Sequence, residues 1–546
     1  MRKKLCLILA VSMIVFILAG CTSNTSAPES TSEPEQNTAS PTDTPSETVP
    51  SNPMPIVTDG TTLSILTVEN PYSGASLTEN LPVWQEMENI TGVKIEWQVS
   101  NQDQYEITAQ TRLAAGINLP DIIDMPGEAY KYGTGGIVIA LDDYIDKYGE
   151  YATQCFAEKT KLQSLMKSPE GVTYHLSSVR DEEMQAGPTG WLIRKDWLDK
   201  LGLEEPKTTD DWLNTLRAFK NDDANGNGLA DEIPFTIRSG LRQLLNWSGS
   251  WDLHLKASSG FYPNSEGKIE YEWFKPEAKE MILYLRSLYE EQLIDAEALT
   301  NTKEQYTSRI TSNVAGSTIQ WQEYTTNWNS VLKEGGVADA HWVLVDVPYA
   351  DGHNGIIESE GYTNSIISIS KDCKNPEIAY RWLDYLLYSE DAAKLMTIGI
   401  EGQTYHMENN EIVMDENVTN NPDGLGPVEV IRSIGAWQYL PFRLYAEYVS
   451  KLKLSDPEHI ERSVFVADNF VDRMEFGIAT DEENNAIMLP LTDINTYLEE
   501  SVTGFITGTK SMDEWDAFIQ AIKDIGIDKI LVVYQTQYDR LQENLN

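Results

Sequence analysis

The residues that indicate the fold most directly lie between Val93 and Ser100 and read Val93-Lys94-Ile95-Glu96-Trp97-Gln98-Val99-Ser100. Apolar and polar side chains alternate strictly here, which is typical of a β-strand with one buried face. Before this stretch, residues 63–68 favour a strand and residues 82–90 favour a helix. After it, a helix through 112–116 precedes a strand that opens at 120–123. Strands that alternate with helices predict βαβ units, a mainly parallel sheet and an α/β fold.

The length and the charge of the chain narrow the classes of function. With 546 residues, the chain can form more than one domain and bury a large core. Its 41 basic and 85 acidic residues give a formal net charge of −44. We find no basic stripe, so nucleic-acid binding is not expected. The acidic residues are dispersed and predict a solvated surface rather than a site.

The first 21 residues have the pattern of a targeting segment. Arg2, Lys3 and Lys4 precede an apolar run, which ends in Leu18-Ala19-Gly20-Cys21. This tetrapeptide resembles a bacterial lipobox, so we expect a signal peptide over 1–21 and a lipid anchor, including palmitate, on Cys21. An ordinary secretory signal that is cut elsewhere is the alternative. No later run is long and apolar enough to span a bilayer, so the mature chain is expected to be anchored rather than spanning.

Residues 22–60 predict a disordered tether. They are rich in Ser, Thr, Pro and Glu and contain almost no large apolar residues, so they lack the material for a core. Cys155 and Cys373 are the cysteines beyond the targeting segment, too few for a disulfide framework. They could pair or remain two thiols, and the sequence slightly favours two thiols.

A polar loop follows a predicted helix in the middle of the chain. It reads Asp222-Asp223-Ala224-Asn225-Gly226-Asn227-Gly228-Leu229-Ala230-Asp231-Glu232-Ile233-Pro234. Oxygen-bearing side chains alternate, and if Asp223 is first, Gly228 is sixth, where an EF-hand loop turns sharply. Leu229 is then seventh, where a backbone carbonyl binds the ion. The spacing predicts a structural Ca²⁺ site, and an ordinary Asn-Gly turn is the alternative.

The loop departs from an EF-hand at its end. The twelfth position, a glutamate in EF-hands, is Pro234 here, and the acid comes earlier, at Glu232. The preceding helix has a cap at Thr208 or Thr209 and an apolar face that includes Trp212 and Phe219. A bound ion would therefore tie a helix end to the following chain.

Several stretches together resemble the extracellular solute-binding proteins of ABC importers, family 1, in particular its long lipoprotein branch with the alginate-oligosaccharide-binding proteins. They keep their order over nearly the whole mature chain, behind the lipobox. The stretches are Leu119 to Ile123, Ile193 to Leu198 through Leu201 to Leu203, Asp223 to Pro234, Asn375 to Leu387, Gly399 to Gly402, and Phe505 to Arg540.

The resemblance implies a two-lobe α/β fold of the periplasmic-binding-protein type, class II, with a hinge and a ligand cleft between the lobes. We expect the N-terminal lobe over 61–188 and 359–405 and the C-terminal lobe over 189–358 and 406–546. The resemblance also implies a Ca²⁺ ligand set. Its members here are Asp223, Asn225, Asn227, the Leu229 carbonyl, Asp231 and Glu232.

The resemblance further implies a function. The expected protein is a monomer on the extracellular face of the bacterial cell membrane that captures an oligosaccharide and delivers it to the permease subunits of an ABC importer. A surface polysaccharide-degrading enzyme and a ligand sensor with the same fold are the alternatives. The histidines lack zinc-type spacing and no Gly-x-Ser-x-Gly elbow is present, so we expect no enzyme.

Aromatic side chains are the expected ligand contacts, because their faces pack against the C–H side of a sugar ring. Trp247, Trp251, Trp321 and Trp437 lie among Ser, Gly, Asn and Gln without a helical apolar stripe, and core packing is the alternative for each. Tyr72 and Tyr362 are further candidates. If the sugar is acidic, Arg443 is a candidate partner. The sequence does not identify the sugar.

Overall fold

The structure is a computed structural model. It describes residues 50–180, 189–238, 240–359, 361, 363–419, 421, 425–453, 458, 461–462 and 468–545. The chain divides into two units, residues 1–48 and residues 49–546, and the description below concerns the second unit. Within that unit, the hydrophobic cores define two α/β lobes, which we call the first and the second lobe.

The first lobe is built on a five-stranded sheet with the order β2-β1-β3-β11-β4. Strands β1 (Thr62–Val68), β2 (Lys94–Ser100) and β3 (Ile122–Met125) are parallel, as predicted, and β2 is the edge strand. Strand β11 (Thr363–Ile369) is antiparallel to β3 and to β4 (Leu176–Val179). Strand β4 therefore runs in the same direction as β1, β2 and β3, and the reversed strand β11 makes the sheet mixed.

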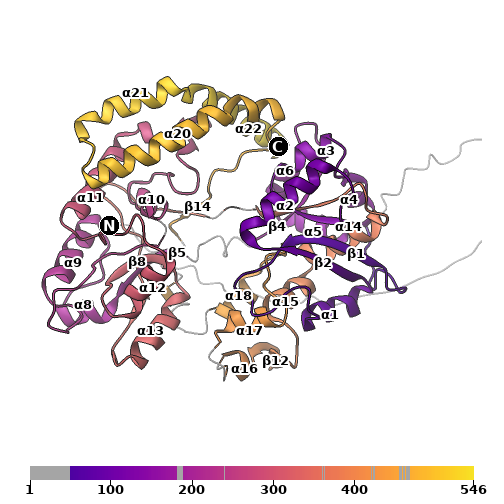
Figure 1. Cartoon of the computed structure of the whole chain (residues 1–546), viewed down its shortest axis with the longest axis horizontal. Coiled ribbons are helices and arrows are strands. Elements are labelled where there is room, and N and C mark those ends of the chain that lie inside the picture. Colours follow the sequence, from indigo (N-terminus) through magenta and orange to yellow (C-terminus); the bar gives the residue numbers. More distant parts are fainter. Residues whose placement is uncertain are drawn as a thin grey trace, which may run out of the picture. The chain divides into compact units, whose positions relative to one another are not determined.

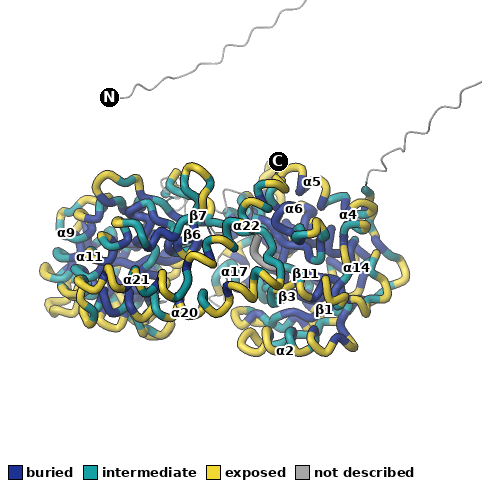
Figure 2. The backbone as a smooth tube through the Cα atoms, turned by 90° about the horizontal axis from the view of Figure 1, so that it is seen from above, coloured by how far each residue is buried: buried dark blue, intermediate teal, exposed yellow. Residues whose placement is uncertain are grey.

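Adjacent residues of β1 belong to different cores, because successive side chains of a strand point to opposite faces. Ile65 packs in the larger core with helices α1, α5 and α14, whereas Leu66 packs with α2. Figure 1 shows these helices around the sheet, and Figure 2 shows the buried course of α14. The helices of this lobe are α1 (Pro82–Thr91), α2 (Gln102–Ala115), α3 (Ala129–Thr134), α4 (Asp142–Tyr148), α5 (Glu150–Glu158), α6 (Thr160–Met166), α14 (Pro376–Tyr388) and α15 (Glu390–Ile398).

The ordered fold begins earlier than the expected tether end at residue 60. Asn52 is buried, its N–H donates to Glu150 Oε2 at 2.7 Å, and its side chain donates to Asp384 Oδ2 at 3.1 Å. Ile56 N–H donates to Thr91 O at 2.8 Å. This segment therefore packs through hydrogen bonds rather than through a hydrophobic stripe. Its small polar residues and prolines give no hydrophobic pattern, so the sequence did not predict that it is ordered.

The first lobe also extends beyond residue 405, where we expected the chain to cross into the second lobe. Tyr405, Ile431, Phe442 and Leu452 all pack in the larger core of the first lobe, so the expected boundary is wrong. This region consists of short elements without a repeating pattern. They are β12 (Tyr405–Glu408), β13 (Glu411–Met414), α16 (Glu416–Thr419), α17 (Pro427–Ser433) and α18 (Ala446–Lys453).

The second lobe contains a three-stranded sheet with the order β8-β5-β9. Strands β8 (Ser317–Trp321) and β9 (Trp342–Leu344) are both antiparallel to β5 (Thr189–Arg194), so the parallel expectation fails here. The alternation of strands and helices along the chain does not encode strand direction. A hairpin of β6 (Phe261–Pro263) and β7 (Ile269–Tyr271) lies in the same lobe.

Helices enclose the sheet of the second lobe, and α20, α21 and α22 pack together, as the yellow end of the chain in Figure 1 shows. The predicted N-cap is Thr208 at the start of α9, where Thr208 Oγ1 accepts from Asp211 N at 3.0 Å, and the Asp211 side chain completes a capping box. The helices are α8 (Lys195–Leu201), α9 (Thr209–Asn221), α10 (Gly240–Leu244), α11 (Pro276–Glu290), α12 (Lys303–Thr311), α13 (Tyr324–Glu334), α20 (Asp481–Thr507), α21 (Trp515–Ile525) and α22 (Ile527–Leu545), with short 3₁₀ turns η1 (Leu245–Trp251), η2 (Glu272–Phe274) and η3 (Met512–Glu514).

Two short strands lie where the chain passes between the lobes. Strand β10 (Ile357–Glu358) pairs in parallel with β14 (Phe470–Val471). The Glu358 carboxylate accepts from the N–H groups of Lys256, Ala257 and Ser258 at 2.8 to 3.0 Å. The expected crossing near 188 lies outside the described residues. None of the described helices combines the length and hydropathy that a membrane crossing requires.

Candidate functional site

The loop after α9 turns sharply, as its sequence predicts. Asp223, Gly226 and Gly228 have φ angles of 47°, 75° and 76°, a region that glycine adopts without steric cost. Asp223 Oδ1 accepts from Gly228 N at 3.1 Å, which closes the turn. Lys200 Nζ donates to Asp223 O at 2.6 Å and so fixes the start of the loop against α8.

The polar side chains of this loop point toward one another. Asn225 Nδ2 and Asn227 Nδ2 donate to Asp231 Oδ1 at 2.8 and 3.1 Å. Glu232 Oε1 lies 3.4 Å from Asn225 N. Leu229 N donates to Asn227 Oδ1 at 2.7 Å while the Leu229 side chain is exposed. The loop therefore gathers carboxylate and amide groups, the donors that a hard cation prefers.

The end of the loop joins the core of the second lobe. Ile233 N donates to Val314 O at 2.7 Å, and Gly316 N donates to Ile233 O at 3.0 Å. Among the described residues, no group of three or more His, Cys, Asp or Glu side chains is arranged as a metal site. The fit of this loop to a cation therefore depends on its asparagines and its backbone carbonyl.

Trp247 is a core residue, and the prediction that it contacts ligand is wrong. It has no exposed surface, and its ring centre lies between 5.4 and 5.9 Å from those of Trp191, Trp212, Phe235 and Tyr284. Trp251 is also nearly buried in this core and packs on Tyr284 at 5.5 Å. Both belong to the 3₁₀ turn η1, whose small polar residues give no apolar stripe.

The other predicted aromatic contacts keep solvent-accessible surface. Tyr72 is 46 % exposed, and Trp321, at the end of β8, and Trp437 are half-buried. The Trp437 backbone has a φ of 49°, and its carbonyl accepts from Asn70 Nδ2 at 3.3 Å. This bond fixes the turn that carries Tyr72. Tyr362 lies outside the described residues.

Cationic side chains from both lobes surround Tyr72. Lys303 Nζ, from α12 of the second lobe, lies 4.8 Å from the centre of the Tyr72 ring. Arg432 Cζ, from α17 of the first lobe, lies 5.9 Å from the same ring. Tyr324 and Tyr439 are within electrostatic range of both Tyr72 and Arg432. Arg238 is within electrostatic range of Tyr324. We call this set the Tyr72 cluster; it consists of Tyr72, Arg238, Lys303, Tyr324, Arg432 and Tyr439.

The Tyr72 cluster combines exposed rings with a partly desolvated cation. Tyr324 is 41 % exposed and continues into a stack with Trp328, at 5.7 Å between ring centres. Burial lowers the pKa of Arg432 and raises that of Tyr439. Arg432 Nε donates to Trp437 O at 3.4 Å. Sequence reasoning missed all members except Tyr72, because none of the others stands in a recognisable motif.

A buried carboxyl group lies in the first lobe near the carboxyl end of β3. Asp124 is 7 % exposed, and burial raises its pKa to about 7. Thr67 Oγ1 donates to Asp124 Oδ2 at 3.1 Å and partly offsets this effect. The carboxyl therefore holds a proton more strongly in the folded chain than in the unfolded chain.

Arg443, the predicted partner for an acidic sugar, is engaged within the first lobe. It is 5 % exposed, its Nη2 lies 2.8 Å from Glu158 Oε2, and its guanidinium stacks on Tyr445 at 4.3 Å. An arginine that is already paired and buried has little capacity left for a ligand, so this prediction is wrong.

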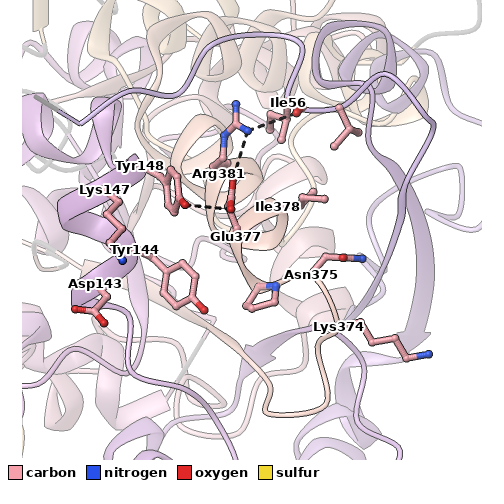
Figure 3. A pocket seen from close by; sticks show the side chains of 12 residues that line it. Ile56, Asp143, Tyr144, Lys147, Tyr148, Lys374, Asn375, Glu377, Ile378 and Arg381 are labelled. Carbon is pink, nitrogen blue, oxygen red and sulfur yellow. Dashed lines mark hydrogen bonds and ion pairs between the residues drawn. The ribbon is translucent and has the colours of Figure 1, made fainter. Parts of the chain in front are cut away.

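Figure 3 shows a pocket of 640 Å³ between α4, the start of α14 and residues 56–57. Tyr148 Oη donates to Glu377 Oε2 at 3.0 Å across it, and Arg381 approaches the same carboxylate at 3.9 Å. Lys147 and Lys374 lie at its edge. None of the aromatic residues predicted from the sequence lines this pocket, which is formed by the first lobe alone.

The fold places the chain among two-lobe periplasmic solute-binding proteins, and the family is shown directly. The chain belongs to the bacterial extracellular solute-binding protein family, whose model matches residues 74–393. The predicted two-lobe α/β fold is thereby confirmed. The members of this family are binding proteins.

Two curated relatives illustrate the range of the family. The fructooligosaccharide ABC transporter substrate-binding protein FusA of Streptococcus pneumoniae is 27 % identical over 517 residues, covering 89 % of this chain and 91 % of the relative. The polygalacturonan/rhamnogalacturonan-binding protein YtcQ of Bacillus subtilis is 24 % identical over 330 residues, covering 59 % of this chain and 63 % of the relative.

Two solved structures share the fold. The alginate-binding protein AlgQ2 without calcium ion superposes with a TM-score of 0.71 at 23 % identity, covering 89 % of this chain and 99 % of that one. An EF-hand mutant of Streptococcus pneumoniae FusA in complex with fructo-nystose has a TM-score of 0.70 at 23 % identity and covers 88 % of this chain and all of the other. One of these structures is thus of a protein without calcium ion, and the other is of a protein with a mutated EF-hand.

Proposed function

We propose that this chain is the extracellular solute-binding component of a bacterial ABC importer, and that it captures an oligosaccharide between its two lobes without turning it over. Relatives named for fructooligosaccharide and polygalacturonan support the carbohydrate class. An importer requires reversible binding, because the ligand must be released to the permease. Stacking on exposed aromatic rings suits that requirement, since it is tolerant of ring position and moderate in strength.

The observation that carries this proposal is the contact of Lys303 with the Tyr72 ring, at 4.8 Å. The two residues come from different lobes, and the exposed Tyr324 and the half-buried Tyr439 are within electrostatic range of Tyr72. A ligand at this point would contact both lobes at once, so binding would favour the closed arrangement. Trp321 and Trp437 are proposed as further stacking residues, each half-buried in the described structure.

A thermal-shift screen of the mature protein against an oligosaccharide panel tests the proposal. The panel contains fructose-, galactose-, xylose- and mannose-type chains and uronates, with short peptides as controls. We expect at least one oligosaccharide to raise the melting temperature and to be recovered intact. A response to peptides only, or cleavage of the stabilising sugar, would contradict the proposed function.

We further propose that the loop after α9 binds one structural Ca²⁺ through Asp223, Asn225, Asn227, Leu229 O, Asp231 and Glu232. The convergence of these groups supports a site for a hard cation. Rotation of the two asparagine amides by half a turn would present their oxygens to the ion. When bound, the ion would supply a cross-link between the end of α9 and the segment that begins at Ile233.

The chain is proposed to be a monomer, anchored on the outer face of the cell membrane through a lipid on Cys21. The lipobox-like Leu18-Ala19-Gly20-Cys21 supports this assignment. Residues 22–49, rich in Ser, Thr and Pro, would then connect the anchor to the folded lobes.

A further inference from the structure

The arginines of this protein are generally paired with carboxylates, as expected in a chain with 85 acidic residues and 41 basic ones. Ion pairs of this kind occur in both lobes, at Arg194, Arg217, Arg286, Arg309, Arg381, Arg443, Arg462, Arg473 and Arg540. Against this background, a half-buried cation without a carboxylate is unusual, because burial without a partner is costly for a charged group.

The Tyr72 cluster gathers such cations. Arg238 and Arg432 are half-buried and Lys303 is exposed. Within the described residues, none of the three has a carboxylate at ion-pair distance. The bond that Arg432 does make is to a neutral acceptor, the carbonyl of Trp437. Like charges contributed by both lobes therefore approach one exposed ring. The ring face attracts each cation, but no carboxylate among the described residues offsets the repulsion between the cations.

The nearest acids do not neutralise these cations. Glu429 is within electrostatic range of Arg432, but its Oε2 caps α17 by accepting from Gly426 N at 2.8 Å. Glu304 is within electrostatic range of Lys303 and Arg238 but projects into solvent, where screening weakens its effect. Burial raises the pKa of Tyr324, and the negative charge of Glu323 adds to this effect. The acids thus lie around the cluster without pairing with its cations.

The position of Lys303 in its helix also indicates a site for a negatively charged group. It is the first residue of α12, next to the N-cap Thr302. A cation at this position opposes the helix dipole, whose N-terminal end is positive and favours anions. Both the side chain and the helix end therefore contribute positive potential beside the Tyr72 ring.

We infer that the natural ligand is an oligosaccharide that carries negative charge on its rings, as a uronate does, and this inference rests on the proposed function. A ring carboxylate would accept hydrogen bonds from the planar guanidinium of Arg432 and from Lys303, while the sugar ring packs on Tyr72. Both neutral and acidic sugars are named for relatives of this chain, so the charge of the cluster decides between them.

The test compares matched pairs of oligosaccharides by calorimetric titration. Trimers of galacturonate, mannuronate and glucuronate are each titrated beside the neutral trimer of the same linkage that carries a hydroxymethyl group instead of the carboxylate. A sulfated galactose trimer distinguishes a sulfate ester from a carboxylate as the source of charge. We expect the tightest ligand to be charged, and its affinity to fall as salt is raised from 50 to about 500 mM.

Two variants assign the effect to the cluster. Lys303→Gln and Arg432→Gln should each weaken the charged ligand about tenfold or more, and the matched neutral trimer much less. Lys303 is exposed, so its variant will fold even if Arg432→Gln does not. Lys333→Gln, an exposed lysine of the same lobe, is the control and should leave affinity unchanged.

The outcomes separate the two proposals. A neutral trimer as the tightest ligand, or a charged ligand that is indifferent to both variants, would overturn the inference while leaving the proposed function intact. Binding of no oligosaccharide at all would overturn the proposed function itself.

Discussion

Lys303 Nζ lies 4.8 Å from the centre of the Tyr72 ring, so the turn after β1 in the first lobe meets the start of α12 in the second. The two residues are far apart in the sequence, and they come together because the polypeptide passes between the lobes. A side chain at this point lies against both lobes, so Tyr72 is the first residue to test.

Replacing Tyr72 with alanine should weaken oligosaccharide binding about thirtyfold, because truncation of an aromatic hot spot commonly costs about 2 kcal/mol. Tyr72 is 46 % exposed, so the melting temperature of the free protein should change by no more than a few degrees. Calorimetric titration measures the affinity. Tyr148→Ala, in the pocket of Figure 3, is the control. A larger loss of affinity in this variant would indicate that the ligand binds in that pocket instead.

Trp247→Ala should destabilise the protein rather than alter a ligand contact. The indole is fully buried among four aromatic neighbours, and truncation of a buried Trp costs about 3–5 kcal/mol. Urea unfolding gives the change in the free energy of unfolding, with Trp437→Ala, a half-buried residue, for comparison. Equal stability of Trp247→Ala and the wild type, together with weaker sugar binding, would restore the original ligand assignment.

Removal of calcium should lower the melting temperature. An ion that binds only the native state stabilises it by about 2.7 kcal/mol at a hundredfold excess over Kd. Asp223→Ala should abolish the response to a chelator, whereas Asp222→Ala, next to the loop but outside the proposed ligand set, should retain it. Atomic emission analysis of the purified protein provides the stoichiometry. A protein that contains no calcium and melts identically with and without chelator would refute the site.

Stability should carry a pH-dependent contribution from Asp124. Burial raises the pKa of this carboxyl to about 7 in the folded chain, against about 3.9 in an unfolded chain. The contribution is therefore fully present below pH 3.9 and is lost as the pH rises through 7. Asp124→Asn should raise the free energy of unfolding by roughly 1–3 kcal/mol at pH 8 and hardly at all at pH 4.

Urea denaturation of Asp124→Asn at the two pH values measures this difference. The exposed Asp143→Asn is the control for a change in net charge. A gain of equal size at pH 4 and pH 8 would show that ionisation of Asp124 does not account for it.

The lipid anchor is tested at Cys21. In native membranes, mass spectrometry of the mature N-terminus should find a diacylated or triacylated cysteine, and Cys21→Ser should release the protein into the medium or leave its leader uncut. An unmodified N-terminus elsewhere in the wild-type protein would indicate an ordinary secretory signal.

The parts of the fold that local patterns encode were predictable from the sequence. The alternation at residues 93–100 predicted a strand, which is β2, and the cap predicted at Thr208 or Thr209 is found at Thr208, where α9 starts. The polar spacing from Asp223 to Glu232 predicted a loop whose side chains do converge. In each case, neighbouring residues in the chain determine the structure.

Features that depend on distant contacts were not predictable. Trp247 lies in a polar sequence but inserts into a core built by other segments. Arg443 appeared available, yet its partner Glu158 is distant in the chain. The Tyr72 cluster draws residues from separate elements of both lobes, and no spacing in the sequence connects them.

Calorimetric titration of the calcium-loaded mature protein with the oligosaccharide identified by the thermal-shift screen shows most directly whether the protein binds that sugar reversibly. We expect a saturable isotherm for one site per chain, with no heat of reaction after saturation. A continuous heat of reaction would reveal turnover and contradict a binding protein, and the absence of any binding heat would contradict the oligosaccharide as ligand.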